Sequence, residues 1–171
     1  MADRCSKSFY QRDVLDVAPD LLGKIIVRKF DTRSEQRFII TEVEAYRGME
    51  DLACHASKGK TVRTDVMFRE GGLVYVYLIY GIYWMLNIVT GIENEPTAAL
   101  IRGVENISGP GRVGKALQLD KSFYGENLLT SDRIWIEDSK LQINFETTPR
   151  IGIDYAGEPW VSKPWRYLLK T

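Results

Sequence analysis

The segment LVYVYLIYGIYWMLNIV (73–89) decides the fold. Two runs of β-branched and aromatic residues, Leu73–Tyr80 and Ile82–Val89, flank Gly81, which can turn the chain. Such residues favour strands, and a glycine between two of these runs is typical of a hairpin. We therefore predict an antiparallel hairpin with Tyr80 at its turn.

The same region invites a second interpretation as a membrane span, because Gly71–Ile92 contains no charged residue. Its content argues against that interpretation. Four tyrosines, four glycines and Asn87 interrupt the apolar run. We expect a hairpin of a globular domain and no association with a membrane.

The segments around the hairpin alternate short apolar runs with turns, which favours an antiparallel sheet with a few helices and hence an α+β fold. We expect one domain over 1–171, with 1–12 as a flexible N-terminal segment. Two helices are predicted, Asp13–Leu22 with Gly23 as its stop, and Arg112–Leu119. The other predicted strands are Lys24–Phe30, Gln36–Tyr46, Thr97–Glu105, Arg133–Glu137, Arg150–Ile153 and Trp165–Leu169.

Composition agrees with a single globular domain. The chain has 171 residues, 44% of them hydrophobic and 27% charged, against about 100–200 residues for a typical domain. Lys and Arg number 23, as do Asp and Glu, so the formal net charge is zero. The whole molecule therefore exerts no electrostatic pull on nucleic acid or membrane, and any such partner must be bound by a local patch.

Only Cys5, Cys54 and His55 offer soft metal ligands. Two cysteines exclude a disulfide scaffold, and tetrahedral zinc needs more Cys and His ligands than these, so we expect no metal site. The N-terminus has no apolar signal segment. Unpaired thiols without a signal favour an intracellular compartment.

Two carboxylates and a tyrosine share one face of the strand predicted at Gln36–Tyr46. Alternate residues of a strand point the same way, which groups Glu42, Glu44 and Tyr46. A solvated strand face is one interpretation. The other is a site in which burial or the second carboxylate raises the pKa of one Glu, so that it acts as a base.

A polar loop follows this strand and carries His55 close to Lys58, Lys60 and Arg63. A lone histidine is often a structural hydrogen-bonding residue. Its place in a loop near two carboxylates favours a functional role as the alternative. Cys54 is a poor candidate nucleophile, because adjacent residues such as Cys54 and His55 rarely aim their side chains at each other.

The tyrosines of the hairpin allow two interpretations. Tyr75 and Tyr77 share one strand face, where aromatic residues usually pack in a core. Tyr80 lies at the turn, where its own sheet cannot easily bury it. A large aromatic side chain at a hairpin tip can wedge between bases, and aromatic faces stack on bases.

A second basic cluster consists of Arg102, Arg112, Lys115 and Lys121. With two acidic residues in 102–121, this stretch has a local net charge of +2. The sequence Gly109-Pro110-Gly111 precedes the second predicted helix and leaves backbone N–H groups open to an anion. A solvated basic face is the alternative interpretation of this cluster.

Together these segments resemble one known family. The order TEVEAY (41–46), ACHAS (53–57), MFREGGLVYVYLIYGIYWMLNIV (67–89), ALIRGVE (99–105), GPGRVGKAL (109–117), LDKSF (119–123), TPRIGI (148–153) and PWRYLL (164–169) is similar to that of the alkyladenine (3-methyladenine) DNA glycosylases. The resemblance runs from about Asp13 to Leu169. It implies a single mixed domain with a curved antiparallel sheet, flanking helices and a protruding hairpin.

The resemblance also implies the activity. Members of this family are monofunctional glycosylases without lyase activity, and they need no metal or cofactor. They remove 3-methyladenine, 7-methylguanine, ethenoadenine or hypoxanthine from double-stranded DNA during base excision repair. We therefore expect a monomer that acts inside the cell with the DNA, in the cytoplasm or nucleoid of a bacterium or the nucleus of a eukaryote.

By motif match, the resemblance assigns roles to individual residues. Glu44 matches the water-activating glutamate, and Arg102 matches the arginine near the catalytic water. Tyr80 matches the tyrosine that intercalates where the damaged base has left the duplex. The residues matched to base binding are Tyr46, His55, Tyr77 and Asn87, and the basic residues expected at the DNA backbone are Lys58, Lys60, Arg63, Arg112, Lys115 and Lys121.

Two other functions compete with this one. A catalytically silent protein that binds damaged DNA would keep Tyr80 and the basic patches but would not need Glu44. A carboxylate-based hydrolase of free nucleosides or sugars would use Glu42 and Glu44 but has no use for a Tyr-tipped hairpin. A DNA affinity that falls steeply with salt would favour the glycosylase or the silent DNA-binding protein over the hydrolase of free nucleosides or sugars.

Overall fold

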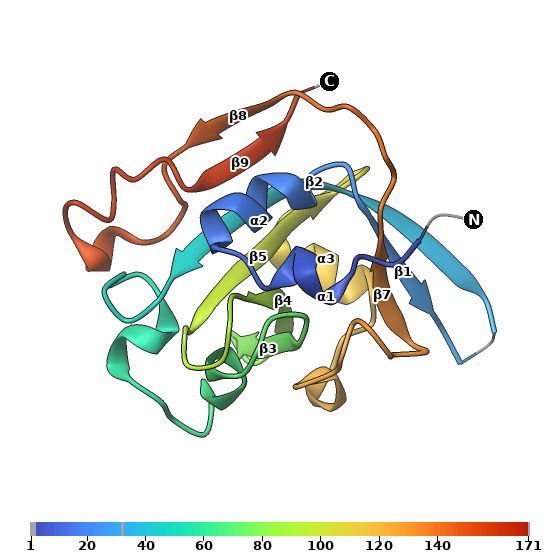
Figure 1. Cartoon of the computed structure of the whole chain (residues 1–171), viewed down its shortest axis with the longest axis horizontal. Helices are drawn as coiled ribbons and strands as arrows, with labels where there is room; N and C mark the ends of the chain where they lie inside the picture. Colours follow the sequence, from blue (N-terminus) through green and yellow to red (C-terminus); the bar gives the residue numbers. More distant parts are fainter. Residues whose placement is uncertain (1–2, 32, 171) are drawn as a thin grey trace.

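The computed structural model describes residues 3–31 and 33–170, and in this part of the chain nine strands form one antiparallel sheet (Figure 1). The main path of the sheet runs β3-β4-β5-β2-β1-β7, with β6 added to β5 and the pair β9–β8 added to β2. The strands are β1 (Ile25–Lys29), β2 (Glu35–Arg47), β3 (Val74–Ile79), β4 (Tyr83–Thr90), β5 (Thr97–Val104), β6 (Ile107–Ser108), β7 (Ile134–Glu137), β8 (Phe145–Thr148) and β9 (Arg166–Leu169). The predicted α+β class and antiparallel sheet are confirmed.

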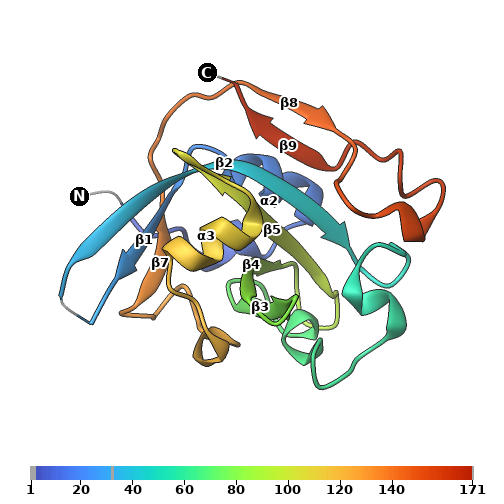
Figure 2. The same ribbon diagram turned by 180° about the vertical axis from the view of Figure 1, so that it is seen from behind.

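The longest strand, β2, joins the two halves of the sheet. Its first half pairs with β1, from Ile25 opposite Ile39 to Lys29 opposite Glu35. Its second half pairs with β5 on one side and with β9 on the other. A strand shared in this way bends the sheet, which curls into a half-barrel visible in both ribbon views (Figures 1 and 2).

The predicted hairpin is confirmed as β3–β4. Its register runs from Val74 opposite Ile88 to Ile79 opposite Tyr83. Tyr80, Gly81 and Ile82 connect the strands, and the Ile82 N–H bonds the Ile79 carbonyl. Tyr80 and Gly81, the central residues of that bonded turn, have positive φ of 54° and 67°, as in the hairpin turns that match strand twist. The Tyr80 side chain is 86% exposed, so the strands hold an aromatic ring in solvent at the tip.

Helices cover the sheet on both sides. Helix α2 (Val14–Leu21) begins where the Asp13 side chain accepts a hydrogen bond from the Leu15 N–H, as an N-cap should. It packs against β2 and β5 and lies in front of the sheet with α1 (Lys7–Tyr10) in Figure 1. Helix α3 (Pro110–Ala116) packs against β4 and β5 and is nearest the viewer in Figure 2. Four short 3-10 helices complete the described elements: η1 (His55–Lys58), η2 (Asp65–Phe68), η3 (Lys121–Phe123) and η4 (Asp154–Ala156).

Strand alternation divides the central sheet into two faces. One face contributes Val43, Ala45, Leu86, Ile88 and Ile101 to the main hydrophobic core together with α2. Side chains at the alternate positions of the same strands must point to the opposite face. That second face carries the tyrosines of β3 and the carboxylates of β2.

Three details differ from the sequence prediction. The strand predicted at 150–153 is wrong, because this segment is a loop whose Arg150 makes a buried ion pair in place of ladder hydrogen bonds, and β8 lies earlier. The second helix begins two residues sooner than predicted, at Pro110, a position at which proline is well tolerated, and it ends at Ala116. Residues 3–12, expected as a flexible segment, lie against the core, with Tyr10 fully buried and the Cys5 N–H bonded to the Ile136 carbonyl.

Helix α3 approaches β4 so closely that it needs glycine at the contact. A Cβ built on Gly114 would lie 1.8 Å from the Trp84 carbonyl oxygen. We expect Gly114→Ala to push α3 away from β4 and to destabilise the protein by about 1–3 kcal/mol, the usual cost of overpacking. Urea unfolding measures this effect, and Lys115→Ala, at an exposed position of the same helix, is the matched control. Equal midpoints for the two variants would contradict the prediction.

Candidate active site

The register of four strands assembles a row of side chains on the second face of the sheet. Tyr75 of β3 lies opposite Asn87 of β4, Asn87 lies opposite Leu100 of β5, and Leu100 lies opposite Glu44 of β2. Directly opposed residues share a face. Antiparallel pairing alone therefore brings Glu44 into line with the tyrosine of the hairpin.

A β-bulge places Arg102 beside this row. Ile101 pairs with Val43 and Gly103 pairs with Glu42, which leaves Arg102 as an extra residue in β5. Gly103 fits the crowded position, because a Cβ there would lie 3.1 Å from the Thr41 hydroxyl. Bulges often re-aim a side chain next to an active site.

Glu44 is completely buried and its carboxylate is fully engaged. One oxygen, Oε1, accepts a hydrogen bond from the Tyr46 hydroxyl at 2.8 Å and lies 3.5 Å from Nη1 of Arg102. The other oxygen, Oε2, accepts a hydrogen bond of 2.7 Å from the backbone N–H of Ile151. Two side chains and one backbone group therefore fix both oxygens of this carboxylate.

Burial raises the pKa of Glu44 above its ordinary value, and Arg102, the Ile151 N–H and Tyr46 offset part of that rise. Burial and the adjacent carboxylate hold the pKa of Tyr46 well above the usual range of a phenol. Tyr46 therefore remains a hydrogen-bond donor to Glu44. A carboxylate with a raised pKa in such a setting is suited to accept a proton.

The second carboxylate of the strand, Glu42, has a different environment. Its Oε2 accepts hydrogen bonds from Nε of Arg166 at 2.6 Å and from Nε of Arg102 at 3.3 Å. Two guanidinium groups therefore hold Glu42, and Glu42 in turn orients Arg102. The prediction that Glu42, Glu44 and Tyr46 share a face is confirmed, and the interpretation of this face as a merely solvated one is wrong for the buried Glu44.

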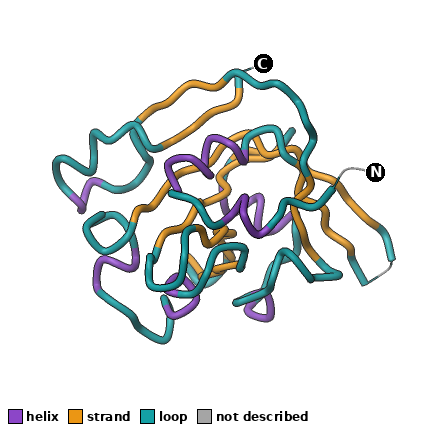
Figure 3. Tube along the Cα trace, viewed as in Figure 1, coloured by secondary structure: helices purple, strands orange, loops and turns teal. Residues whose placement is uncertain are grey.

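A cavity of about 490 Å³ opens over this face, within the range of about 300–1,000 Å³ typical of small-molecule sites. Its sheet side is built by β2–β5, and its other sides are the loops 51–63 and 150–155, which lie close together beyond the end of β2 in Figures 1 and 3. Its polar and aromatic lining consists of Tyr46, His55, Arg63, Tyr75, Tyr77, Tyr80, Asn87, Arg102 and Tyr155.

The sequence-predicted residues fall into two groups in the structure. The cavity brings together Tyr46, His55, Arg63, Tyr77, Tyr80, Asn87 and Arg102, with Glu44 bonded to its lining from behind. The other basic residues, Lys58, Lys60, Arg112, Lys115 and Lys121, are exposed and lie outside the cavity lining.

His55 is held on the cavity wall by two tyrosines. Its Nδ1 lies 2.9 Å from the Tyr75 hydroxyl, and its ring meets the Tyr77 ring edge-on at 4.6 Å. Burial, together with the nearby Arg63 and Lys58, lowers the pKa of His55 to about 4. The imidazole is therefore neutral at physiological pH.

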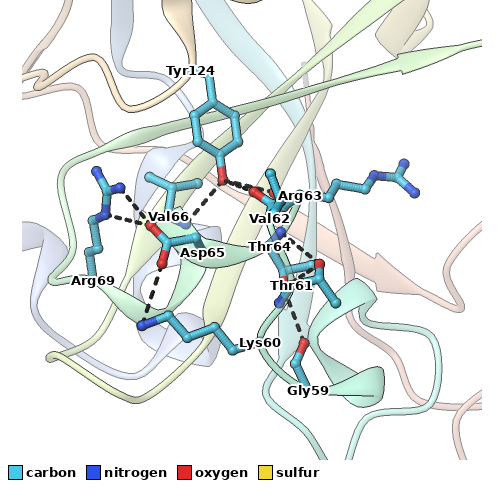
Figure 4. A network of polar contacts seen from close by, with 10 residues as sticks. All are labelled: Gly59, Lys60, Thr61, Val62, Arg63, Thr64, Asp65, Val66, Arg69 and Tyr124. Carbon is cyan, nitrogen blue, oxygen red and sulfur yellow. Dashed lines mark hydrogen bonds and ion pairs between the residues drawn. The ribbon is translucent and has the colours of Figure 1, made fainter.

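The loop 59–66 is fastened by the hydroxyl of Tyr124, the residue that directly follows η3 (Figure 4). Tyr124 donates to the Arg63 carbonyl at 2.9 Å and accepts from the Val66 N–H at 3.2 Å. Thr61 and Thr64 bond each other, and Lys60 pairs with Asp65 at 3.4 Å. The network holds Arg63 with its guanidinium 5.1 Å from the centre of the Tyr77 ring, at the rim of the cavity.

Comparison with known proteins bears on these features. The model of one protein family, described as methylpurine-DNA glycosylase (MPG), matches residues 8–108 and 105–171. The chain belongs to the methylpurine-DNA glycosylase family. The resemblance read from the motifs is thereby confirmed, and with it the class of DNA-repair glycosylases, hydrolases that act on N-glycosyl bonds in DNA.

Several similar proteins carry the name "Putative 3-methyladenine DNA glycosylase". One from Wolbachia pipientis wMel is 46% identical over 168 residues, covering 94% of this chain and 88% of the relative. One from Legionella pneumophila (strain Corby) is 43% identical and covers 96% and 93%. One from Methanocella arvoryzae is 40% identical and covers 96% and 92%.

The glycosylase also contains site residues that sequence reasoning missed. Tyr155 lines the cavity and donates from its hydroxyl to the Ala53 carbonyl at 3.1 Å. Ile151 supplies the N–H that binds Glu44, and its neighbour Arg150 is paired with Asp51. The segment TPRIGI (148–153) of the resemblance contains Arg150 and Ile151, but the sequence predicts a strand over 150–153. No motif singles out Asp51 or Tyr155.

Other chemistry has less support in the glycosylase. Burial raises the pKa of the Cys54 thiol to about 12, so it is a poor nucleophile. Across residues 3–31 and 33–170, no three His, Cys, Asp or Glu side chains gather as metal ligands would.

No helix in the same ranges has the length and apolar character to cross a membrane.

The raised pKa of Glu44 predicts the direction in which the stability of the protein changes with pH. A carboxyl whose pKa is higher in the folded state favours folding at low pH and loses that contribution as pH rises through the folded pKa. Gln cannot titrate, so we expect the Tm of Glu44→Gln to rise relative to the parent between pH 4.5 and 8. Thermal melts followed by circular dichroism measure this difference.

Glu126→Gln is the matched control for these melts. Glu126 is partly buried, but Arg133 and Ser131 hold its pKa below the ordinary value. The trend for Glu126→Gln should therefore be the reverse, with the variant losing Tm relative to the parent as pH rises. Parallel trends for both variants would overturn the assignment for Glu44.

Proposed function

We propose that the glycosylase is monofunctional and hydrolyses the N-glycosidic bond of alkylated or deaminated purines flipped out of double-stranded DNA. The substrates we propose are 3-methyladenine, 7-methylguanine, ethenoadenine and hypoxanthine. The observation that carries the proposal is the position of the buried Glu44 carboxylate directly behind an aromatic cavity, with Tyr80 exposed at its rim. A base inside the duplex stack is out of reach of such a cavity, so it must be flipped.

Base binding in this proposal depends on the aromatic walls. Tyr46 and Tyr77 present electron-rich rings, and a cationic or electron-poor alkylated purine stacks well on such rings. Burial keeps the pKa of Tyr77 near 12 and raises that of Tyr75, so both phenols stay neutral. We assign the Tyr75 hydroxyl as the donor to Nδ1 of His55, the arrangement in which Nε2 carries the proton and can hydrogen-bond the base or its phosphate.

Asn87 supports a choice among purines. Its side chain is 4% exposed and its Nδ2 donates to the Tyr75 carbonyl at 3.2 Å, which fixes the amide in the cavity floor. A fixed amide cannot turn to accommodate an extra amino group. We assign to Asn87 the rejection of undamaged guanine, whose N2 amino group distinguishes it from hypoxanthine.

The chemical step uses Glu44 as the base. A water between the sugar and Glu44 gives its proton to the carboxylate while its oxygen bonds to C1′ and the C1′–N9 bond breaks. The electron pair of that bond leaves with the purine. The negative charge of Glu44 also stabilises the oxocarbenium-like sugar, and Arg102, 3.5 Å from Glu44, orients the carboxylate or the water.

A lyase step would need an amine nucleophile at C1′. No lysine lines the cavity in the described parts of the chain, which supports a glycosylase that stops at the abasic site.

We further propose that the protein acts as a monomer inside the cell. The residues proposed to contact the DNA backbone are Arg63 and the exposed Lys58, Lys60, Arg112, Lys115 and Lys121.

The competing functions fit the geometry less well. A silent DNA-binding protein has no use for a carboxylate held by three donors, because burying it costs free energy that binding does not recover. A hydrolase of free nucleosides has no use for an aromatic ring held in solvent at a hairpin tip. The combination of Glu44 and Tyr80 therefore favours the glycosylase.

Glu44→Gln tests the proposed chemistry. Gln keeps the shape and can still accept hydrogen bonds but cannot take a proton, so we expect base release to fall by about 10²–10⁴-fold. A single-turnover assay on duplexes with one hypoxanthine or one ethenoadenine, cut with alkali after reaction, measures this loss, and release of free 3-methyladenine from methylated DNA covers the third lesion. Retained binding to damaged DNA is the control, and near-parental cleavage by the variant would refute the role of Glu44.

Tyr80→Ala tests the proposed wedge. Without the ring, the gap left by the flipped base stays empty, so we expect a smaller fluorescence increase from 2-aminopurine placed beside the lesion and slower base release. Tyr80→Phe keeps the stacking surface and should behave like the parent. The wedge role fails if the alanine variant gives the parental fluorescence change.

A further inference from the structure

We propose that the buried pair Asp51–Arg150 is a positioning device of the active site, which holds the Ile151 N–H on Glu44 and ties together the two loops that form the cavity walls. This inference rests on the proposed function, since it assigns a task to residues behind the reacting carboxylate. Neither residue touches the cavity, so both are positioning residues.

The pair is a bidentate ion pair that is fully buried. Nη1 of Arg150 lies 2.6 Å from Oδ2 of Asp51 and Nη2 lies 3.0 Å from Oδ1, and both side chains have no exposed surface. The two parallel bonds fix the plane of the guanidinium as well as its distance. A third bond, 2.9 Å from Nη1 to the Ala45 carbonyl, anchors the guanidinium on β2 between Glu44 and Tyr46.

Each partner fixes one wall of the cavity. Asp51 accepts hydrogen bonds from the backbone N–H groups of Arg47 and Ala53, which shape the loop that leads to His55. Arg150 directly precedes Ile151, whose N–H binds Oε2 of Glu44 at 2.7 Å. A displacement of the guanidinium would therefore move the N–H that holds the carboxylate.

Stability alone is a poor explanation for this buried ion pair, because burying the two charges costs free energy. Nε of Arg150 is buried without a hydrogen-bond partner, and a buried ion pair often gains nothing over apolar packing. The guanidinium is instead sandwiched near two rings, 4.9 Å from the centre of Tyr46 and 5.0 Å from that of Trp165. Tyr46 is also the donor to Oε1 of Glu44, so Arg150 lies near one donor to the carboxylate and directly precedes another, Ile151.

The ionisation of Glu44 reports on this positioning. The cations facing its carboxyl are Arg102 and Arg150, and the phenols facing it are Tyr46, Tyr77 and Tyr155. The Ile151 N–H lowers the pKa of Glu44 against the effect of burial. Losing that bond while all charges stay in place would raise the pKa, and the acid limb of the rate profile would move to higher pH.

The main test is Arg150→Lys, which keeps the positive charge but loses the two-pronged geometry. Single-turnover release of hypoxanthine or ethenoadenine is measured from pH 5 to 9 for the parent, Arg150→Lys, Asp51→Asn and Glu44→Gln. The matched control is Glu126→Gln, which breaks a pair with Arg133 outside the cavity lining. We expect Arg150→Lys and Asp51→Asn to lose about 10-fold or more in rate, because a misplacement of about 1 Å can cost 10²-fold. Arg150→Lys should also shift the acid limb to higher pH, and Glu126→Gln should match the parent.

Two further measurements separate positioning from folding. Binding to a duplex with a tetrahydrofuran abasic analogue should stay near the parental value in both variants, and circular dichroism should show a cooperative melt. A parental rate and acid limb in Arg150→Lys would overturn the inference, as would a rate loss that follows the loss of folded protein with an unshifted limb. If Arg150→Lys does not fold, Asp51→Asn decides by its rate.

The parent and Glu44→Gln keep this inference distinct from the proposed function. If the parent releases no damaged base, the proposed function fails. If the parent is active, Glu44→Gln is inactive and the two positioning variants equal the parent, the proposed function stands and only this inference fails.

Discussion

The burial of one carboxylate is the constraint on which the rest of the site depends. Glu44 has no contact with bulk water, and an isolated carboxylate in such a place would be protonated. Arg102, the Tyr46 hydroxyl and the Ile151 N–H replace the lost hydration. These donors come from β5, β2 and the loop after β8, so the curled sheet and its C-terminal extension must all be in place for Glu44 to stay charged once it is buried.

Much of this arrangement follows from strand periodicity. Alternation along β2 groups Glu42, Glu44 and Tyr46, and alternation along β3 groups Tyr75 and Tyr77, so both sets were predictable from the sequence. The hairpin and its exposed Tyr80 followed from Gly81 between two apolar runs. Antiparallel register then needed only to align these strands, which is why a local pattern located so much of the site.

What remained hidden depends on contacts between residues distant in sequence. Asp51 and Arg150 are 99 positions apart, and nothing local marks either as buried, because charged residues are usually exposed. The bulge at Arg102 is likewise a property of a strand pair, not of one strand. The segment 150–153 looked like a strand because its apolar residues alternate, but Arg150 forms its bonds with Asp51 and Ala45, and the loop thus formed carries Ile151 to Glu44.

The formal net charge of the chain is zero, and the arginines behind the active site add little attraction to DNA. Arg102, Arg150 and Arg166 are each held by an internal carboxylate, so they shape the active site and contribute little to attraction towards DNA. Arg63 is differently placed, because it is exposed and lies over the Tyr77 ring at the rim of the cavity. Under the proposed function, weak overall attraction favours release from undamaged duplex, and residence then depends on whether a base enters the cavity. On this proposal, discrimination resides in the cavity walls and in the loops that the Asp51–Arg150 pair ties together.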